Sequence, residues 1–143
     1  IVGNAGILVT EVIFVKDAED KAFVIVDAAM NDLIRPTLYE AWHEIVPVVA
    51  AAADAPRIRA DVVGPVCETG DYLALDRDMP RPAPGDLLAV SSAGAYGAVQ
   101  AGTYNSRLLV PEVLVKGDRF HVIRPRRTYE ELIGLDSVPD WLA

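Results

Sequence analysis

Short runs of β-branched and aromatic residues, separated by charged loops, glycine or proline, most limit what this chain can fold into. Residues 7–15 read ILVTEVIFV, a six-residue polar loop follows, and residues 22–26 read AFVIV. Two such runs around a short loop predict a β-hairpin. Gly117-Asp118 separates two later runs and is typical of a two-residue hairpin turn. The other strand-like runs lie at 57–66, 86–91, 111–116 and 119–123.

One helical pattern interrupts the strands. Leu38, Trp42 and Ile45 recur at helical spacing, and proline at position 36 suits the first turn of a helix. A short amphipathic helix is therefore expected from about Pro36 to Glu44, with Pro47 ending it.

A second, shorter helical turn is expected near the end of the chain. Thr128 can cap the segment TYEELIGL, and Glu131 lies three positions further on, which is the spacing of a capping box. The chain as a whole has many short strands and frequent glycine and proline. This pattern predicts a mainly β fold, a Greek-key-like β-barrel or sandwich with one short helical excursion.

The composition fits one domain spanning residues 1–143, with 52% hydrophobic residues and a net charge of −8. The acidic balance argues against nucleic acid or an anionic membrane as a partner. The longest apolar run, Val46–Ala53, is too short to span a bilayer. The single cysteine excludes an internal disulfide and suits the cytoplasm. The chain starts at Ile1 without a methionine, which favours a domain cut from a longer polypeptide.

The first candidate site lies around the expected helix. Arg35 directly precedes the helix and Tyr39 follows one turn later, so both side chains can face one ligand. The planar guanidinium of arginine can bind a carboxylate through two parallel hydrogen bonds. The alternative is a surface arginine beside a half-buried tyrosine.

Two further clusters combine reactive side chains with glycine. Cys67 and Glu68 lie in the turn GPVCETGD, where a thiol can act as a proton donor or nucleophile. Tyr96 lies in SAGAYG, where glycines allow a ligand to approach the backbone closely and leave the phenol exposed. The alternatives are a small buried cysteine and a structural turn with an incidental tyrosine.

Other residues suggest less. The polar segment Thr103–Arg107 can line a site or bridge strands. His43 and His121 have no neighbouring cysteine, histidine or carboxylate at the spacing of a zinc site, so no metal is expected. The sequence contains no Ser-His-Asp arrangement, P-loop or dinucleotide-binding fingerprint.

Taken in order, these segments resemble the alanine-racemase-like, or group IV, family of pyridoxal-phosphate (PLP) decarboxylases. Within that family they are most similar to the branch that acts on diaminopimelate. The one departure noted in the cysteine turn is Thr69, where a serine is usual. The matching segments are Asn4–Gly6, Phe23–Ala28, Met30–Pro36, Leu38-Tyr39, Gly64–Asp71, Pro84–Asp86, Ala93–Gly97, Tyr104–Arg107 and Thr128–Leu132.

The resemblance implies a fold, a reaction and a cofactor. Family members join an α/β barrel, which carries pyridoxal 5′-phosphate on a lysine, to a β-domain, and this chain resembles only the β-domain. The implied reaction is decarboxylation of meso-diaminopimelate to L-lysine and CO2. The isolated fragment is expected to be inactive, because nothing in it resembles the barrel's lysine segment.

The resemblance also implies roles for the five candidate residues. Tyr96 is expected to contact the cofactor, and Arg35, Tyr39 and Glu68 to bind the substrate. Arg35 and Glu68 would bind its distal amino-acid end. Cys67 would be the acid at the reacting carbon, and Cys67 and Glu68 would reach the partner's site in a homodimer.

Two alternative functions stay open. A related PLP decarboxylase could act on ornithine, arginine, lysine or carboxynorspermidine, although Arg35 would be less useful for substrates without the distal amino-acid end. A non-catalytic binding or dimerisation module is the second alternative, and for the isolated chain it can be literally true.

Overall fold

The computed structural model describes residues 1–142, which divide into two compact units. The first unit is Ile1–Ala101 and the second begins at Gly102. Strands dominate both units, which confirms the prediction of a mainly β fold with a barrel-like sheet.

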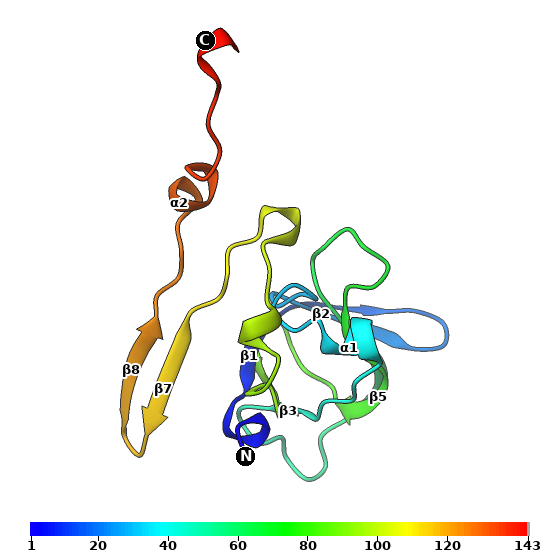
Figure 1. Cartoon of the computed structure of the whole chain (residues 1–143). Coiled ribbons are helices and arrows are strands. Elements are labelled where there is room, and N and C mark those ends of the chain that lie inside the picture. Colours follow the sequence, from blue (N-terminus) through cyan, green and yellow to red (C-terminus); the bar gives the residue numbers. More distant parts are fainter. Residues whose placement is uncertain (143) are drawn as a thin grey trace. The chain divides into compact units, whose positions relative to one another are not determined.

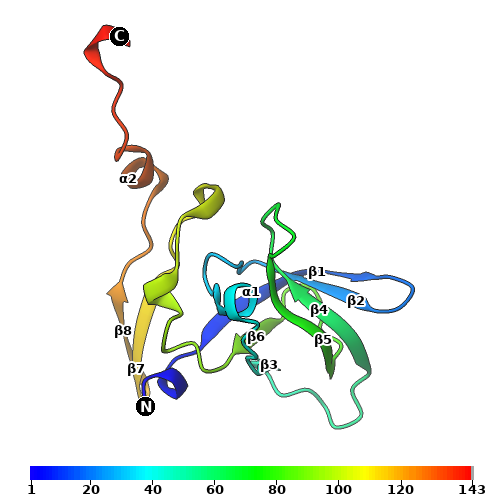
Figure 2. The same ribbon diagram turned by 45° about the vertical axis from the view of Figure 1, so that its right-hand side comes forward.

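A six-stranded sheet forms the body of the first unit (Figures 1 and 2). Its strands lie side by side in the order β3-β6-β1-β2-β4-β5, and all neighbouring pairs are antiparallel except β2 and β4. The strands are β1 (Leu8–Asp17), β2 (Ala22–Val26), β3 (Ile45–Pro47), β4 (Arg57–Val63), β5 (Tyr72–Pro80) and β6 (Leu87–Val90).

The predicted hairpin at the start of the chain is confirmed. β1 pairs with β2, from Asp17 opposite Ala22 to Val12 opposite Val26, with a register shift between Val12 and Phe14. Successive side chains of a strand point to opposite faces, and alternate residues of β2 are buried accordingly. The buried core residues of the unit include Val12, Val24, Val26, Leu33, Val62, Leu73, Leu88 and Val90.

The predicted helix is present but shorter than expected. α1 covers Arg35–Tyr39 and ends there because Glu40 adopts a left-handed conformation, with φ of 55°, and its N–H bonds back to the Arg35 carbonyl. The prediction of a helix to about Glu44, ended by Pro47, is therefore wrong. Pro47 instead lies in the short strand β3.

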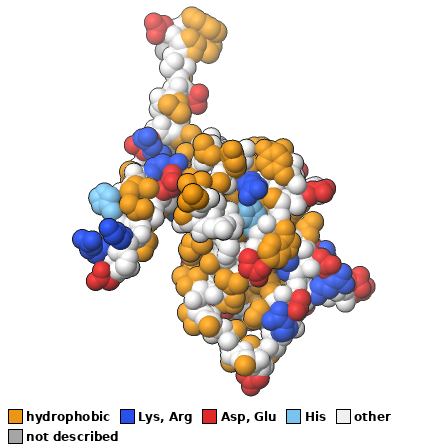
Figure 3. All heavy atoms as spheres, turned by 60° about the horizontal axis from the view of Figure 1, so that its bottom comes forward, with side chains coloured by type: hydrophobic (Ala, Val, Ile, Leu, Met, Phe, Trp, Pro, Cys, Tyr) orange, Lys and Arg blue, Asp and Glu red, His pale blue; other side chains and the backbone are white. Residues whose placement is uncertain are grey.

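The sequence pattern also missed β5. Its centre carries three consecutive charged residues, Asp76 to Asp78, which interrupt the apolar pattern of a strand. Two of them bind arginines of β4: Asp78 pairs with Arg57, and Asp76 pairs with Arg59. Acidic and basic side chains lie next to each other on the face that Figure 3 presents. Opposite charges across neighbouring strands therefore replace the expected alternation.

The second unit contains a two-stranded sheet, β7 (Glu112–Lys116) and β8 (Arg119–Arg124), joined at Gly117-Asp118 as predicted. Gly117 has φ of 62°, a conformation that glycine adopts without strain. The capping box of helix α2 (Tyr129–Ile133) is also present, since Thr128 and Glu131 each accept a backbone N–H from the other. Within residues 1–142, no helix has both the length and the apolar character needed to cross a membrane.

Four short 3-10 helices complete the described chain. They are η1 (Gly3–Ala5), η2 (Ala98–Gln100), η3 (Tyr104–Ser106) and η4 (Asp140–Leu142).

Candidate functional site

Helix α1 carries the first two candidate residues. Arg35 is its first residue and is half-buried, and Tyr39 is its last and is 57% exposed. Residues four apart lie on the same face of a helix, so the guanidinium and the phenol project from one side of α1. Pro36 is buried at the first turn and fixes the backbone there.

Arg35 is hydrogen-bonded to His43, a residue that the sequence patterns did not connect with the site. The Nη1 atom of Arg35 lies 3.4 Å from Nε2 of His43, and Nδ1 of His43 lies 2.8 Å from the carbonyl oxygen of Ser91. The His43 side chain is 1% exposed. No carboxylate among residues 1–142 forms an ion pair with Arg35. Arg35 is therefore a half-buried cation without a counter-ion among the described residues.

Cys67 and Glu68 lie on an exposed turn between β4 and β5. Asp71, which is 4% exposed, closes this turn by accepting the backbone N–H of Val66 at 2.6 Å. The N–H of Asp71 in turn donates to the Glu68 carbonyl at 3.0 Å. Gly64 is needed beside the Asp71 carboxylate, because a Cβ there would lie 2.5 Å from its oxygen. The exposed position of Cys67 excludes the buried-cysteine alternative.

The turn that carries Cys67 is joined to α1. The hydroxyl of Thr37, in the middle of the helix, donates to the carbonyl of Gly70. A side chain at Gly70 would collide with the Thr37 methyl group at 2.7 Å. Asp71 links the same turn to the segment that precedes α1, since its other oxygen accepts the N–H of Met30 at 2.7 Å.

Tyr96 lies on a turn that follows β6. Its side chain is 62% exposed, and its φ of 58° is unusual for a residue other than glycine. Gly94 makes this turn possible, because a Cβ there would lie 2.0 Å from the carbonyl oxygen of Val2. The turn therefore leaves the phenol exposed.

This second turn is also joined to α1. The amide of Gln100, in η2, donates to the Tyr39 hydroxyl at 3.2 Å. Ser91, which directly precedes the turn, accepts the bond from His43. Helix α1 thus connects the turn of Cys67 and Glu68, through Thr37, with the turn of Tyr96, through the candidate residue Tyr39 itself.

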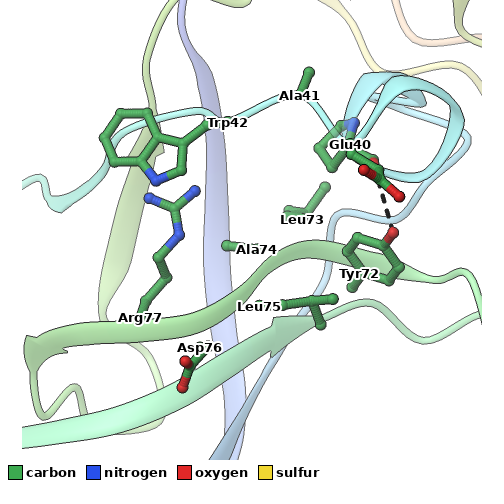
Figure 4. Close-up of a pocket in the computed structure, with 10 residues that line it drawn as sticks. Glu40, Ala41, Trp42, Tyr72, Leu73, Ala74, Leu75, Asp76 and Arg77 are labelled. Carbon is green, nitrogen blue, oxygen red and sulfur yellow. Dashed lines mark hydrogen bonds between the residues drawn. The ribbon is translucent and has the colours of Figure 1, made fainter.

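A hollow of about 320 Å³ lies between α1, the segment that follows it and β5 (Figure 4). The Arg77 guanidinium stacks on the Trp42 ring, 4.1 Å from its centre. Burial lowers the pKa of Arg77, and the nearby carboxylate of Glu44 opposes this shift. Tyr72 donates a long hydrogen bond of 3.5 Å to the Pro36 carbonyl. These contacts fix the chain around α1.

The remaining polar segment, Thr103–Arg107, contains η3 and belongs to the second unit. His121 is exposed on β8. No group of three or more histidine, cysteine or acidic side chains in the described part of the chain could hold a metal ion.

The candidate side chains carry the chemical groups that binding and protonating an amino acid require. A guanidinium and a carboxylate are suited to the two charges of an amino-acid end, and a thiol can move a proton. An exposed phenol at a glycine-containing turn can donate to an anionic oxygen. The five residues were found from their order in the sequence, whereas only the structure could find His43.

The chain is similar to known proteins over nearly its whole length. The family model for the C-terminal sheet domain of pyridoxal-dependent decarboxylases matches residues 1–94. Diaminopimelate decarboxylase of Pseudomonas aeruginosa is 56% identical over 138 residues, which is 96% of this chain and 32% of that protein. Diaminopimelate decarboxylase of Zymomonas mobilis is 49% identical and covers 99% of this chain and 33% of that protein.

Solved structures agree with this relationship. The crystal structure of diaminopimelate decarboxylase from Helicobacter pylori complexed with L-lysine superimposes with a TM-score of 0.85 at 42% identity. The match covers 94% of this chain and 32% of that one. The chain thus spans about a third of the length of the relatives it matches. It belongs to the family of pyridoxal-dependent decarboxylases, as their C-terminal sheet domain.

Proposed function

We propose that the chain is part of a PLP-dependent diaminopimelate decarboxylase, which converts meso-diaminopimelate to L-lysine and CO2. Relatives that are 49% and 56% identical have this activity in their names. A related structure holds L-lysine, the expected product. On this proposal residues 1–143 act as one C-terminal β-domain of a larger enzyme.

The observation that carries the proposal is the guanidinium of Arg35. It is half-buried and charged, and no carboxylate among the described residues pairs with it. Buried charges are normally paired, so an external carboxylate is the expected partner. Diaminopimelate has a second amino-acid end that supplies one, and ornithine, arginine and lysine do not.

Glu68 and Tyr39 complete the proposed binding of the distal end. Glu68 is an exposed carboxylate suited to the distal ammonium group, and the Tyr39 hydroxyl projects from the same helix face as Arg35. A charged pocket of this kind discriminates more strongly than an apolar one, because a wrong substrate leaves its charges unpaired.

Tyr96 fits a role in binding pyridoxal phosphate, because its phenol is exposed on a turn whose glycine permits close approach. The cofactor, when bound, accepts the electrons released as CO2 leaves. Cys67 would then supply a proton to the carbon that has lost CO2. Its exposed position on the turn lets the thiol reach a reacting carbon outside this chain.

The partner that completes this site is proposed to be a second copy of the enzyme. Cys67 and Glu68 lie on an exposed turn, where they can reach the active site of the other subunit in a homodimer. The cytoplasm is proposed as its location, since a biosynthetic role and the one free cysteine of this chain both suit a reducing compartment.

Steady-state kinetics of the full-length enzyme tests the proposal. Arg35→Ala should raise KM for meso-diaminopimelate by about 10- to 100-fold, since a hydrogen-bonded charge pair is worth roughly 1.5–3 kcal/mol. Arg35→Lys keeps the charge but loses the planar fork, so its KM should lie between those of the wild type and Arg35→Ala. An unchanged KM in Arg35→Ala would remove the substrate assignment.

The proton-donor role of Cys67 needs a separate measurement. Cys67→Ala should lower kcat by about 100- to 10,000-fold, the range typical of a lost general acid. Substrate KM should change little, because Cys67 is not proposed to bind the distal end. Normal turnover in Cys67→Ala would exclude it as the acid.

The isolated chain gives a further control. It should neither decarboxylate diaminopimelate nor change the absorbance spectrum of added pyridoxal phosphate stoichiometrically. A stoichiometric spectral change would contradict the proposal that the cofactor is anchored outside this chain.

A further inference from the structure

We infer that His43 is a positioning residue for Arg35, fixing the orientation in which the guanidinium meets the substrate carboxylate. The inference rests on the proposed function of Arg35 and adds a residue that does not itself touch the substrate. Its starting point is the chain of contacts from the Ser91 carbonyl through the His43 ring to the Arg35 guanidinium.

The hydrogen-bond pattern assigns the proton on the ring. The Ser91 carbonyl can only accept, so Nδ1 of His43, at 2.8 Å, must carry hydrogen. Arginine can only donate, so Nε2 of His43, at 3.4 Å from Nη1, must be the acceptor. Both contacts are satisfied together only by a neutral ring with its proton on Nδ1.

The backbone around His43 keeps the ring in place. The N–H of Ser91 donates to the Glu44 carbonyl at 2.8 Å, and Ile45 pairs with Val90 as β3 joins β6. The His43 ring is 1% exposed, so surrounding atoms restrict its rotation. An acceptor held this firmly can orient a flexible arginine side chain.

The early end of α1 makes the contact possible. Had the helix continued to Glu44, His43 would lie eight residues, or about 12 Å along the axis, from Arg35. The left-handed Glu40 instead turns the chain back, and the N–H of Ala41 bonds to the Arg35 carbonyl at 3.3 Å. The turn after Tyr39 therefore brings His43 to the guanidinium.

The orientation of the guanidinium matters because a carboxylate needs two parallel N–H groups from its fork. An arginine that rotates freely loses side-chain entropy when it binds, whereas one already oriented loses less. Since the bond to His43 is long, its loss should weaken substrate binding by about 1 kcal/mol, which is about fivefold.

Three substitutions in the full-length enzyme separate orientation from mere structure. His43→Gln can present an amide oxygen to Arg35, whereas His43→Met has similar length but lacks that acceptor. His43→Asn can still donate to the Ser91 carbonyl but does not reach Arg35. We expect His43→Gln to keep KM for diaminopimelate within about twofold of wild type. His43→Met and His43→Asn should raise KM about fivefold with kcat nearly unchanged.

The dissociation constant of L-lysine is a second readout, because the product keeps the distal carboxylate. It should rise in parallel with KM. In an Arg35→Ala background, His43→Met should have no further effect on either quantity, since the oriented group is gone. Melting temperatures of all variants report folding separately.

The outcomes distinguish the inference from the proposed function. If His43→Gln and His43→Met raise KM equally while His43→Asn is normal, the ring serves only as a structural anchor, and the inference is overturned. The same holds if His43→Met raises KM equally with and without Arg35. If Arg35→Ala itself leaves KM unchanged, the proposed role of Arg35 fails.

Discussion

The carboxylate of Asp71 accepts the backbone N–H of Met30 at 2.7 Å, across 41 positions of sequence. Its other oxygen accepts the N–H of Val66 at 2.6 Å. One buried side chain thus ties the segment before α1 to the turn that carries Cys67. The relative position of Cys67 and Arg35 depends on this carboxylate.

Replacing Asp71 with asparagine should therefore destabilise the fold. The amide has one acceptor oxygen, so its NH2 group would face one of the two backbone N–H groups. The variant loses a charge-assisted hydrogen bond and leaves a buried donor unsatisfied. Together these effects should lower the free energy of unfolding by about 2–4 kcal/mol. Chemical denaturation of the Asp71→Asn variant measures this free energy of unfolding.

Asp86→Asn is the matched control. Asp86 also accepts a backbone N–H, that of Ala83 at 2.7 Å, but both residues are exposed. Water can replace that bond, so the free energy of unfolding should fall by less than about 1 kcal/mol. Equal effects of the two substitutions would show that burial does not set the importance of Asp71.

Local patterns predicted the fold where local interactions determine it. The β1–β2 hairpin and the capping box of Thr128 depend on residues close in sequence, and both were predicted. β5 was missed because the partners of Asp76 and Asp78 lie on β4, about 20 positions away. Charge pairing between distant strands leaves no periodic signal within either strand.

In the candidate site, too, the features that depend on neighbouring residues were predicted and those that depend on distant residues were not. Order and residue type identified Arg35 and Cys67 as candidates, since the residues of a short motif are adjacent in the sequence and can be recognised there. The contact between Arg35 and His43 required the left-handed Glu40 and the carbonyl of Ser91, which lies 48 positions after His43. Neither the turn at Glu40 nor the distant acceptor can be inferred from helical spacing, which predicted a helix continuing to about Glu44.

Gly94→Ala should weaken cofactor binding by moving Tyr96. The added methyl group would lie 2.0 Å from the carbonyl oxygen of Val2 and 2.8 Å from the Gly6 nitrogen. The backbone must shift, at a cost typical of overpacking, about 1–3 kcal/mol. In the full-length enzyme we expect a lower melting temperature and about 10-fold weaker binding of pyridoxal phosphate, measured by fluorescence titration.

Gly102→Ala is the control for this substitution, because a Cβ there meets nothing within 4 Å. Its melting temperature and cofactor affinity should stay at the wild-type values. Cofactor binding that is normal in Gly94→Ala would contradict a role for the turn in presenting Tyr96.

Arg81→Gln should raise the pKa of Asp17. Hydrogen bonds from Arg81 at 2.8 and 2.9 Å hold the pKa of this exposed carboxyl below its ordinary value of 3.8. A carboxyl with a lowered folded-state pKa contributes stability above its unfolded pKa. That contribution is lost as the pH falls through the lower folded value.

Carbon-13 NMR of labelled aspartate carboxyls across pH 2–5 would measure this change. In Arg81→Gln the pKa of Asp17 should return toward 3.8, and the acid-sensitive contribution of the pair should disappear. Asp76 provides an internal control, because Arg59 lowers its pKa and is untouched. A pKa of Asp17 that stays low without Arg81 would assign the shift to another cause.

Thr128→Ala should open the first turn of α2. The Thr128 hydroxyl accepts the N–H of Glu131 at 3.2 Å, and the Glu131 carboxylate accepts the N–H of Thr128 at 2.9 Å. Loss of an N-cap typically costs about 1 kcal/mol, which corresponds to about fivefold faster hydrogen exchange of the Glu131 amide. Thr128→Ser retains the hydroxyl and should keep the wild-type exchange rate.

Because α2 has only five residues, local opening should expose this amide without unfolding the sheet of the first unit. Faster exchange that extends to the amides of β2 would instead indicate that the cap stabilises the whole chain.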